Sequence, residues 1–218
     1  MMESSWWMSR SKWVLPLGMM FLLVSCGEEV KKELPVLGPY KVVDEVVDGA
    51  LVTDTMFTTV RPFSFTDQDS NEINHATVEG KVFVTDFFFT SCPTICPKMK
   101  QQMLRVYDAF DGESQLVLLS HSIDPIRDSV GRLKDYADKL GIQSDRWHMV
   151  TGNRDSIYSM AKHYMIAAQV DELAPGGYAH SGAFLLIDRN KQIRGIYDGT
   201  SEEEVDVLME DIEWLLHE

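Results

Sequence analysis

Two cysteines, Cys92 and Cys96, stand four positions apart in the segment FFFTSCPTICPKM, which covers residues 87–99. Each is followed by a proline, and the chain contains three cysteines in all. Two thiols at this spacing can serve as a redox couple, as two ligands of a metal ion, or as a structural disulfide. The structural disulfide is the least favoured use, because closing so short a loop removes little conformational entropy from the unfolded chain.

The position of the pair along the chain suits the other two uses. An apolar run precedes Cys92, and Pro97 is tolerated in the first turn of a helix, where its missing N–H would have no partner. The pattern therefore predicts a turn from a strand into a helix. The N-terminus of a helix lowers the pKa of a thiol, and the thiolate is the form that attacks disulfides and binds metals. Location alone leaves redox chemistry and metal binding open.

A metal ion would need a third ligand, and the chain has six histidines. Five of them are interpreted as surface or packing residues: His75, His121, His148, His163 and His217. His180 differs, because it lies in a glycine-rich stretch, APGGYAHSGAFLLID, that leads into a strongly apolar strand. In a thioredoxin-like sheet the loop before this strand faces the cysteine turn. His180 is therefore the candidate for the third ligand.

The elements that must position these residues alternate between strands and helices. Strands are predicted over 81–89, 114–123, 146–152, 182–188 and 192–199, and helices over 98–110, 126–141, 154–165 and 201–218. Asn153 is expected to cap the third helix, and Ser201 with Glu204 to form a capping box on the last. Residues 63–74 predict a β-hairpin ahead of the first strand. The order predicts an α/β fold, a thioredoxin-like mixed sheet flanked by helices with an N-terminal β-hairpin extension.

The N-terminal segment reads as a bacterial lipoprotein leader rather than as part of the fold. Basic residues precede the apolar run WVLPLGMMFLLVS, and LVSC at 23–26 resembles a lipobox that ends at Cys26. We expect a signal peptide over residues 1–25, lipid attachment at Cys26, a polar tether over 26–40 and a folded domain over 41–218. Met8 would give a tidier leader, so we expect it to be the true start.

Composition and charge narrow the function further. The chain has 218 residues, a formal net charge of -14 and a pI of about 4.8. Such a chain does not bind nucleic acid through its overall field, although an acidic face can dock a basic partner. A lipid anchor would hold the domain to a membrane of the bacterial cell envelope, on the periplasmic or extracytoplasmic side. Thiols tend to oxidise in that compartment.

Three motifs in order make the chain resemble the Sco (SenC) family of thioredoxin-fold copper proteins, which assist assembly of cytochrome c oxidase. FFFTSCPTICP resembles the CPxxCP segment of the family, SHSIDPIRDS at 120–129 its strand-end signature, and AHSGAFLLID the segment with its ligand histidine. The resemblance covers about residues 60–216. It implies a copper site made by Cys92, Cys96 and His180, and soft thiolates with an imidazole suit Cu(I).

Two functions follow from this resemblance. The first is a metallochaperone that delivers copper to the copper-site subunit of a terminal oxidase. The second is an extracytoplasmic thiol-disulfide oxidoreductase, with Cys92 and Cys96 as its redox pair, that reduces the cysteines of that copper site. A reducing thioredoxin-like protein would be a further partner.

Other residues of these motifs receive structural expectations. Asp124 and Asp128 are expected to shape their loop and cap the next helix, and Met99 and Met103 to pack in the core. The family commonly has an acidic residue just before the ligand histidine, whereas this chain has Ala179. Asp171 or Glu172 is the expected substitute for that missing carboxylate.

Overall fold

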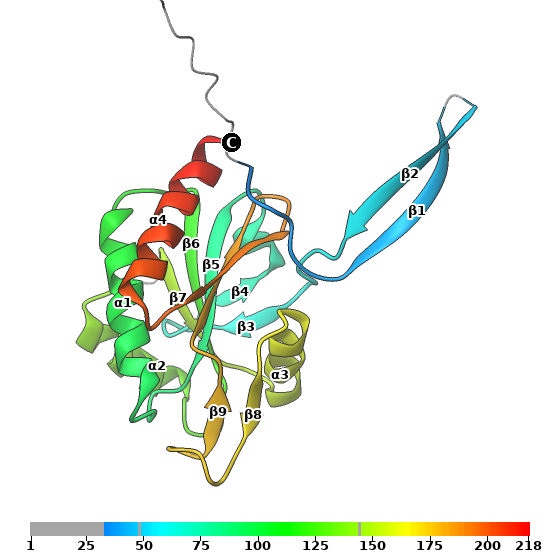
Figure 1. Ribbon diagram of the computed structural model, residues 1–218. Helices are drawn as coiled ribbons and strands as arrows, with labels where there is room; N and C mark the ends of the chain where they lie inside the picture. The colour runs from blue at the N-terminus through cyan, green and yellow to red at the C-terminus, as the bar shows by residue number, and fades with distance from the viewer. Residues whose placement is uncertain (1–32, 48, 144) are drawn as a thin grey trace, which may run out of the picture. The chain divides into compact units, whose positions relative to one another are not determined.

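A five-stranded mixed sheet forms the centre of the computed structural model, which describes residues 33–218 except 48 and 144. The strand order is β11-β10-β5-β6-β7 (Figure 1). Strands β5, β6 and β7 are parallel, and β10 is antiparallel to both β5 and β11. The bounds are β5 Val82–Phe88, β6 Leu116–Ser122, β7 Trp147–Val150, β10 Ala183–Ile187 and β11 Ile193–Asp198. This architecture confirms the predicted fold class.

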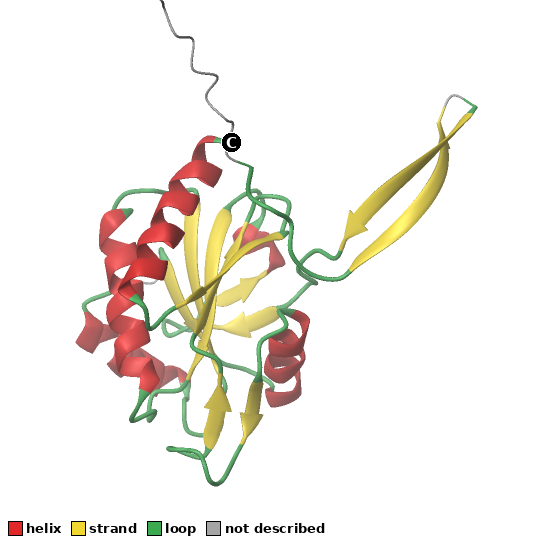
Figure 2. Ribbon diagram, in the orientation of Figure 1, coloured by secondary structure: helices red, strands yellow, loops and turns green. Residues whose placement is uncertain are grey.

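Helices cover both faces of the sheet, with α1 and α4 together on one face and α3 on the other (Figure 2). The bounds are α1 Ile95–Ala109, α2 Val130–Leu140, α3 Arg154–His163 and α4 Glu202–His217, with a 3-10 turn, η1, at His75–Val78. Every residue of β5 and β6 is buried, which explains their nearly continuous apolar runs. Met99 and Met103 are fully buried on α1, as predicted.

The helix caps follow the sequence in part. Asn153 accepts a hydrogen bond from the amide of Ser156, as expected. Ser129 caps α2, so the expectation that Asp124 and Asp128 cap this helix is wrong. Ser201 caps α4, but the Glu204 carboxylate accepts from the amide of Asp198 at 2.7 Å. The α4 cap is therefore only half of the predicted capping box.

The predicted hairpin over 63–74 is present as β3 (Ser64–Thr66) paired with β4 (Glu72–Asn74). Its turn is held against β7 by two buried side chains. Asp67 lies 3.1 Å from Nδ1 of His148, and Gln68 bonds the backbone of both Trp147 and Met149. The hairpin thus closes the β7 edge of the sheet.

A second hairpin was not predicted from the sequence. β1 (Tyr40–Val47) pairs with β2 (Ala50–Phe57) over eight residues each. Just before it, Leu37 forms a bridge with Ile193 on β11, and Leu34 packs against the core. Ordered contacts with the domain thus begin inside the predicted 26–40 tether. The predicted signal peptide and Cys26 lie outside the described residues, and no described helix is long and apolar enough to span a bilayer.

Candidate metal centre

The two cysteines lie where β5 turns into α1. Cys92 stands in the turn that follows β5, and Cys96 is the second residue of the helix. The N-cap, Thr94, makes no side-chain cap bond to the helix; its hydroxyl lies 3.6 Å from Sγ of Cys92. Both cysteines are buried and neither forms a disulfide in this structure. The predicted strand-to-helix turn is thereby confirmed.

His180 reaches this turn from a small hairpin rather than from the loop that the sequence predicts. β8 (Ala168–Val170) pairs with β9 (Tyr178–His180), and His180 is the last residue of β9. Nε2 of His180 lies 3.2 Å from Sγ of Cys96. The two sulfurs and the imidazole offer three ligand atoms that all lie within 4.8 Å of one another.

The hydrogen bonds of the imidazole set its tautomer. Nδ1 of His180 lies 3.0 Å from the carbonyl oxygen of Ser181. Because a carbonyl only accepts, Nδ1 carries the proton and donates it to Ser181. Nε2 is then the unprotonated nitrogen, and its lone pair is directed at Cys96. Burial lowers the pKa of His180, although the Ser181 carbonyl opposes this, so the ring is neutral at pH 7 and is able to act as a ligand.

The two thiols differ in their electrostatic surroundings. Burial raises the pKa of the Cys92 thiol, but hydrogen bonds from the amides of Thr94 and Cys96 and from their side chains outweigh it, and the net effect is a lowered pKa. Burial raises the pKa of Cys96 strongly, and the neighbouring Cys92 adds to that effect. Cys92 is therefore the readier thiolate.

Two buried aspartates brace the site from the loop that follows β6. Asp128 accepts from the Thr90 amide at 3.0 Å, from the Thr90 hydroxyl at 2.5 Å and from Ser122 at 2.6 Å. Asp124 accepts from the hydroxyl of Tyr178, two residues before His180, at 2.8 Å. One loop thus holds both the approach to the cysteine turn and the strand with the histidine. The sequence identified these carboxylates as loop-shaping residues but not their partners.

The tip of the β8–β9 hairpin packs on the cysteine turn through Gly176. A Cβ on this residue would lie 2.6 Å from the Phe89 ring and 3.5 Å from Pro93, and its φ is +85°. Both the close approach and the backbone conformation require glycine. The ring of Phe89 also meets His180 edge-on, with centroids 5.8 Å apart. The Phe89 ring is therefore the apolar contact shared by the hairpin and the turn.

The donor set favours a soft, low-coordinate ion. Two thiolates and one imidazole suit Cu(I), whereas a structural zinc site takes four protein ligands. Among residues 33–47, 49–143 and 145–218, this is the only cluster of three or more cysteine, histidine or acidic side chains that fits a metal ion. Asp171, one of the two residues expected to replace the missing carboxylate, accepts a hydrogen bond from the amide of Leu173. The carboxylate of Asp124 accepts a hydrogen bond from Tyr178, which lies on the same strand as His180.

The fold and the cluster define a class, a thioredoxin-like domain with a dithiol–imidazole site. Comparison with known proteins then specifies the family. A sequence model of the SCO1/SenC family matches residues 52–217, and the chain belongs to that family.

Solved structures agree with this assignment. A SCO1/SenC family lipoprotein of Bacillus anthracis superposes with a TM-score of 0.66 at 28% identity, covering 72% of this chain and 95% of that one. BsSco, a member of the Sco family of cytochrome c oxidase assembly proteins in which a disulfide switch was identified, gives 0.63 at 26%, covering 72% and 92%. Yeast Sco1 with copper bound gives 0.58 at 25%, covering 72% and 89%.

Proposed function

We propose that this protein binds copper through Cys92, Cys96 and His180 and delivers it to the copper-site subunit of a respiratory oxidase. The observation that carries the proposal is the convergence of these three donor atoms within 4.8 Å. Copper bound to yeast Sco1 and the role of BsSco's family in cytochrome c oxidase assembly support it. Copper is the cargo here, so the site must release it as well as hold it.

The three ligands differ in how firmly the fold holds them. The cysteines stand on a turn that joins β5, in which every residue is buried, to the buried face of α1. His180 stands on a strand of three residues whose side chains are only half-buried. Opening the β8–β9 hairpin would remove the imidazole and leave two thiolates, which an incoming ligand of the acceptor can displace in turn.

A copper titration of the reduced full-length protein tests this proposal. We expect one Cu(I) per chain and a loss of affinity of at least tenfold in His180→Ala, with His217→Ala as the matched control at an exposed histidine. A tenfold loss corresponds to about 1.4 kcal/mol of binding free energy. Unchanged Cu(I) affinity in His180→Ala would reject the three-ligand site.

A second function, thiol-disulfide exchange, rests on the asymmetry of the two thiols. The Cys92 thiolate would attack a disulfide of the oxidase copper site and release one partner sulfur as a thiolate. Cys96 would then lose its proton and attack Sγ of Cys92, forming the Cys92–Cys96 disulfide and freeing the second partner sulfur. Two electrons pass to the partner. The Cys92 pKa, lowered while that of Cys96 is raised, supports these roles.

The same histidine variant separates the two functions. Copper delivery needs the imidazole as a ligand, whereas disulfide exchange does not. We expect His180→Ala to leave exchange with a small disulfide substrate largely intact. A parallel loss of exchange would show that the variant damages the cysteine turn itself.

The proposed setting is the bacterial cell envelope, with the domain facing the extracytoplasmic side. The lipobox-like LVSC segment supports a lipid anchor at Cys26, and the Bacillus anthracis relative is a lipoprotein. A reducing thioredoxin-like protein is the proposed source of electrons for the cysteine pair. Mass spectrometry of the membrane-extracted protein would detect a diacylglyceryl group on Cys26.

A further inference from the structure

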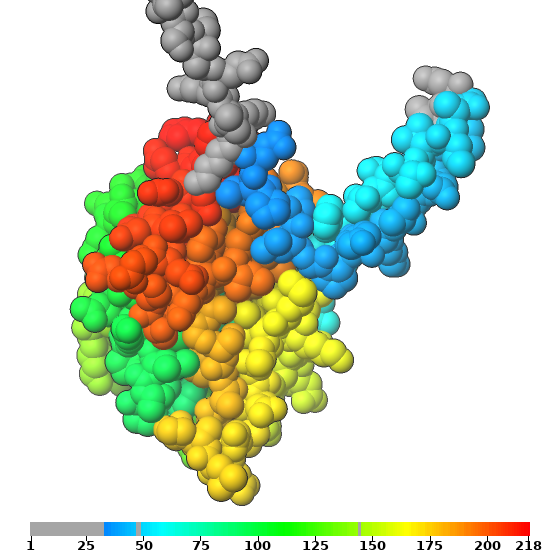
Figure 3. All heavy atoms as spheres, in the orientation of Figure 1, coloured from blue at the N-terminus to red at the C-terminus, as the bar shows by residue number. Residues whose placement is uncertain are grey.

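The hairpin formed by β1 and β2 carries much of the exposed apolar surface. Twelve large hydrophobic side chains are exposed among the described residues, and six of them belong to this hairpin: Tyr40, Val42, Val46, Leu51, Val52 and Met56. Figure 3 shows these strands with their side chains uncovered on the viewed face. The metal centre does not use any of them. Such a concentration of apolar groups marks a contact surface.

The hairpin also has free strand edges. Its backbone ladder runs from the pair Tyr40–Phe57 to the pair Val47–Ala50, and the described residues add no third strand to it. A two-stranded hairpin by itself is marginally stable in water, and a free apolar edge is a template for another strand. The unpaired backbone groups of the β1 edge are therefore available to bind a further strand.

The register shows which backbone groups face outward from β1. Val47 pairs with Ala50 across two intervening residues, one of them Gly49 with φ +82°, as in a tight hairpin turn. The residues that flank such a turn exchange hydrogen bonds with each other. Alternation along an antiparallel ladder then assigns the odd-numbered residues of β1 to β2. The even-numbered residues, from Tyr40 to Val46, direct their N–H and C=O groups to the free edge.

We infer that β1 pairs in antiparallel fashion with β1 of a second copy of this chain, with Val43 on the twofold axis. This register sets Lys41 opposite Glu45 of the partner subunit, and the symmetry repeats the pair. It also sets Tyr40 opposite Val46 of the partner subunit, an aromatic and β-branched pair of the kind that stabilises antiparallel sheets. The edge is thus self-complementary through the Lys41–Glu45 and Tyr40–Val46 pairs.

The alternative register of equal length is disfavoured by charge. If the outward-facing residues are to pair with each other, seven residues can overlap in only two ways. The other way centres on Asp44 and sets it opposite Asp44 of the partner subunit, which places like charges together. The preferred register instead makes a four-stranded sheet with Tyr40, Val42, Val46 and Leu51 on one face, where Asp44 of each copy lies opposite Val42 of the other. A sheet of at least three strands with a hydrophobic face is able to be stable in water, whereas a two-stranded hairpin is only marginally stable, and the dimer has four strands.

A charge-swap cycle on the full chain in dilute detergent tests the pairing. We expect sedimentation equilibrium to show a monomer–dimer equilibrium for the wild type. Lys41→Glu should raise the dimer dissociation constant about tenfold or more, because two opposite-charge pairs become two like-charge pairs. The double variant Lys41→Glu with Glu45→Lys should restore it. Lys139→Glu, an exposed site on α2 with the same change in charge, is the matched control.

A cross-linking experiment tests the register separately. In a background with all three native cysteines replaced by serine, Val43→Cys should form a disulfide-linked dimer. Directly opposed residues at such a position have Cα atoms about 4.5 Å apart, which a disulfide can span. Asp54→Cys, opposite Val43 within the hairpin, should stay monomeric on a non-reducing gel. The inference would be overturned if the wild type is a monomer at all concentrations. It would also be overturned if the charge-swap variants leave the dimer dissociation constant unchanged.

Discussion

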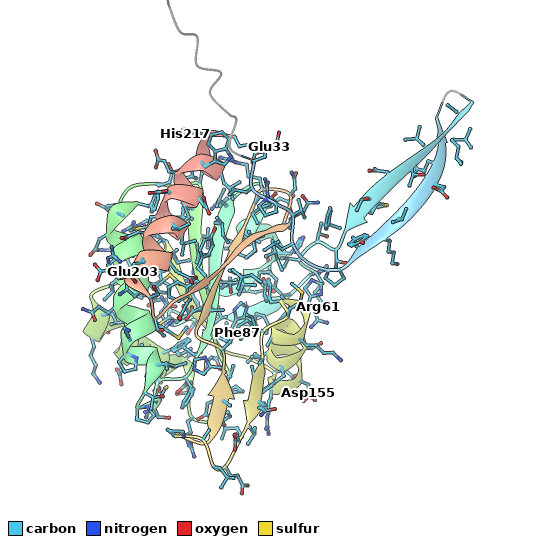
Figure 4. All side chains as sticks on the ribbon, in the orientation of Figure 1. Glu33, Arg61, Phe87, Asp155, Glu203 and His217 are labelled. Atoms are coloured by element: carbon cyan, nitrogen blue, oxygen red, sulfur yellow. The ribbon has the colours of Figure 1, made fainter. Side chains whose placement is uncertain are left out.

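His121 on β6 is a histidine that the fold keeps neutral. Its ring stacks on Phe87, which Figure 4 labels inside the domain, with centroids 4.8 Å apart, and it meets Phe65 edge-on at 5.4 Å. Nδ1 lies 3.1 Å from the Thr85 hydroxyl, and Nε2 is buried without a partner among the described atoms. A proton on Nε2 would have no acceptor.

The lowered pKa of His121 reflects the free-energy cost of protonating this buried ring. Burial lowers it from 6.5 to about 4; the negative charge of Asp86 opposes the shift, and the positive charge of Lys100 adds to it. A shift of this size corresponds to about 3 kcal/mol. Because the folded pKa is the lower one, the unfolded chain takes up the proton first as the pH falls. The contribution of His121 to the free energy of unfolding is complete above pH 6.5 and is lost as the pH falls through 4. About 2 kcal/mol of it is lost between pH 7 and 4.5.

Replacing the histidine should remove this pH dependence. We expect the free energy of unfolding of His121→Phe to fall about 2 kcal/mol less than that of the wild type between pH 7 and 4.5. Urea denaturation followed by tryptophan fluorescence at several pH values measures it. His217→Gln, at an exposed histidine on α4, is the matched control and should follow the wild type.

The difference between the two pH curves, rather than the stability at pH 7, is the decisive quantity. The larger Phe ring is able to cost stability at every pH through overpacking, and that cost cancels in the difference. Parallel curves for wild type and His121→Phe would show that the imidazole is protonated within the folded core, and the reasoning from its unpartnered Nε2 would then be wrong.

Two further substitutions test the buried ion pair of Lys100 and the packing of the histidine hairpin. Lys100 is 1% exposed and bonds Asp86 at 2.7 Å, so Lys100→Met should cost about 3–5 kcal/mol by leaving a buried carboxylate unpaired, and adding Asp86→Asn should recover part of it. Urea denaturation measures both, and a cost below 1 kcal/mol would contradict a buried charge. Gly176→Ala should weaken Cu(I) binding, because its Cβ collides with Phe89 and displaces the histidine hairpin. Gly177→Ala has nearly the same positive φ but open space, so it is the control, and equal effects of the two would assign the loss to backbone strain alone.

Periodicity and composition predicted the central sheet well. The apolar runs over 81–89 and 114–123 are strands because both of their faces are covered, which leaves a continuous apolar signal in the sequence. Helix α1 begins at Ile95, so Pro97 lies in its first turn, as the sequence indicated, and Cys96 lies within the helix. These features depend on local patterns, and local patterns are what a single sequence displays.

The hairpins around the sheet were harder to predict. β8 and β9 have three residues each, too short for a period-two pattern to emerge beside the glycines of the intervening loop. The strands β1 and β2 alternate poorly, because both of their faces are exposed in the monomer and carry mixed side chains. The partners of Asp124 and Asp128 depend on contacts across 54 and 38 residues, which no local signal encodes.

The arrangement of the metal centre follows from the ends of two parallel strands. β5 and β6 are parallel neighbours, so the turn after β5 and the loop after β6 emerge at the same edge of the sheet. The first turn supplies both sulfurs, and the second supplies Asp128, which holds Thr90 at the start of the cysteine turn. Asp124 in that same loop holds Tyr178 and so places the histidine strand. The imidazole is therefore held on a short hairpin, through the Tyr178 hydroxyl and the Phe89 ring, whereas the sulfurs are buried in the core. This difference is the structural basis of the release that we propose.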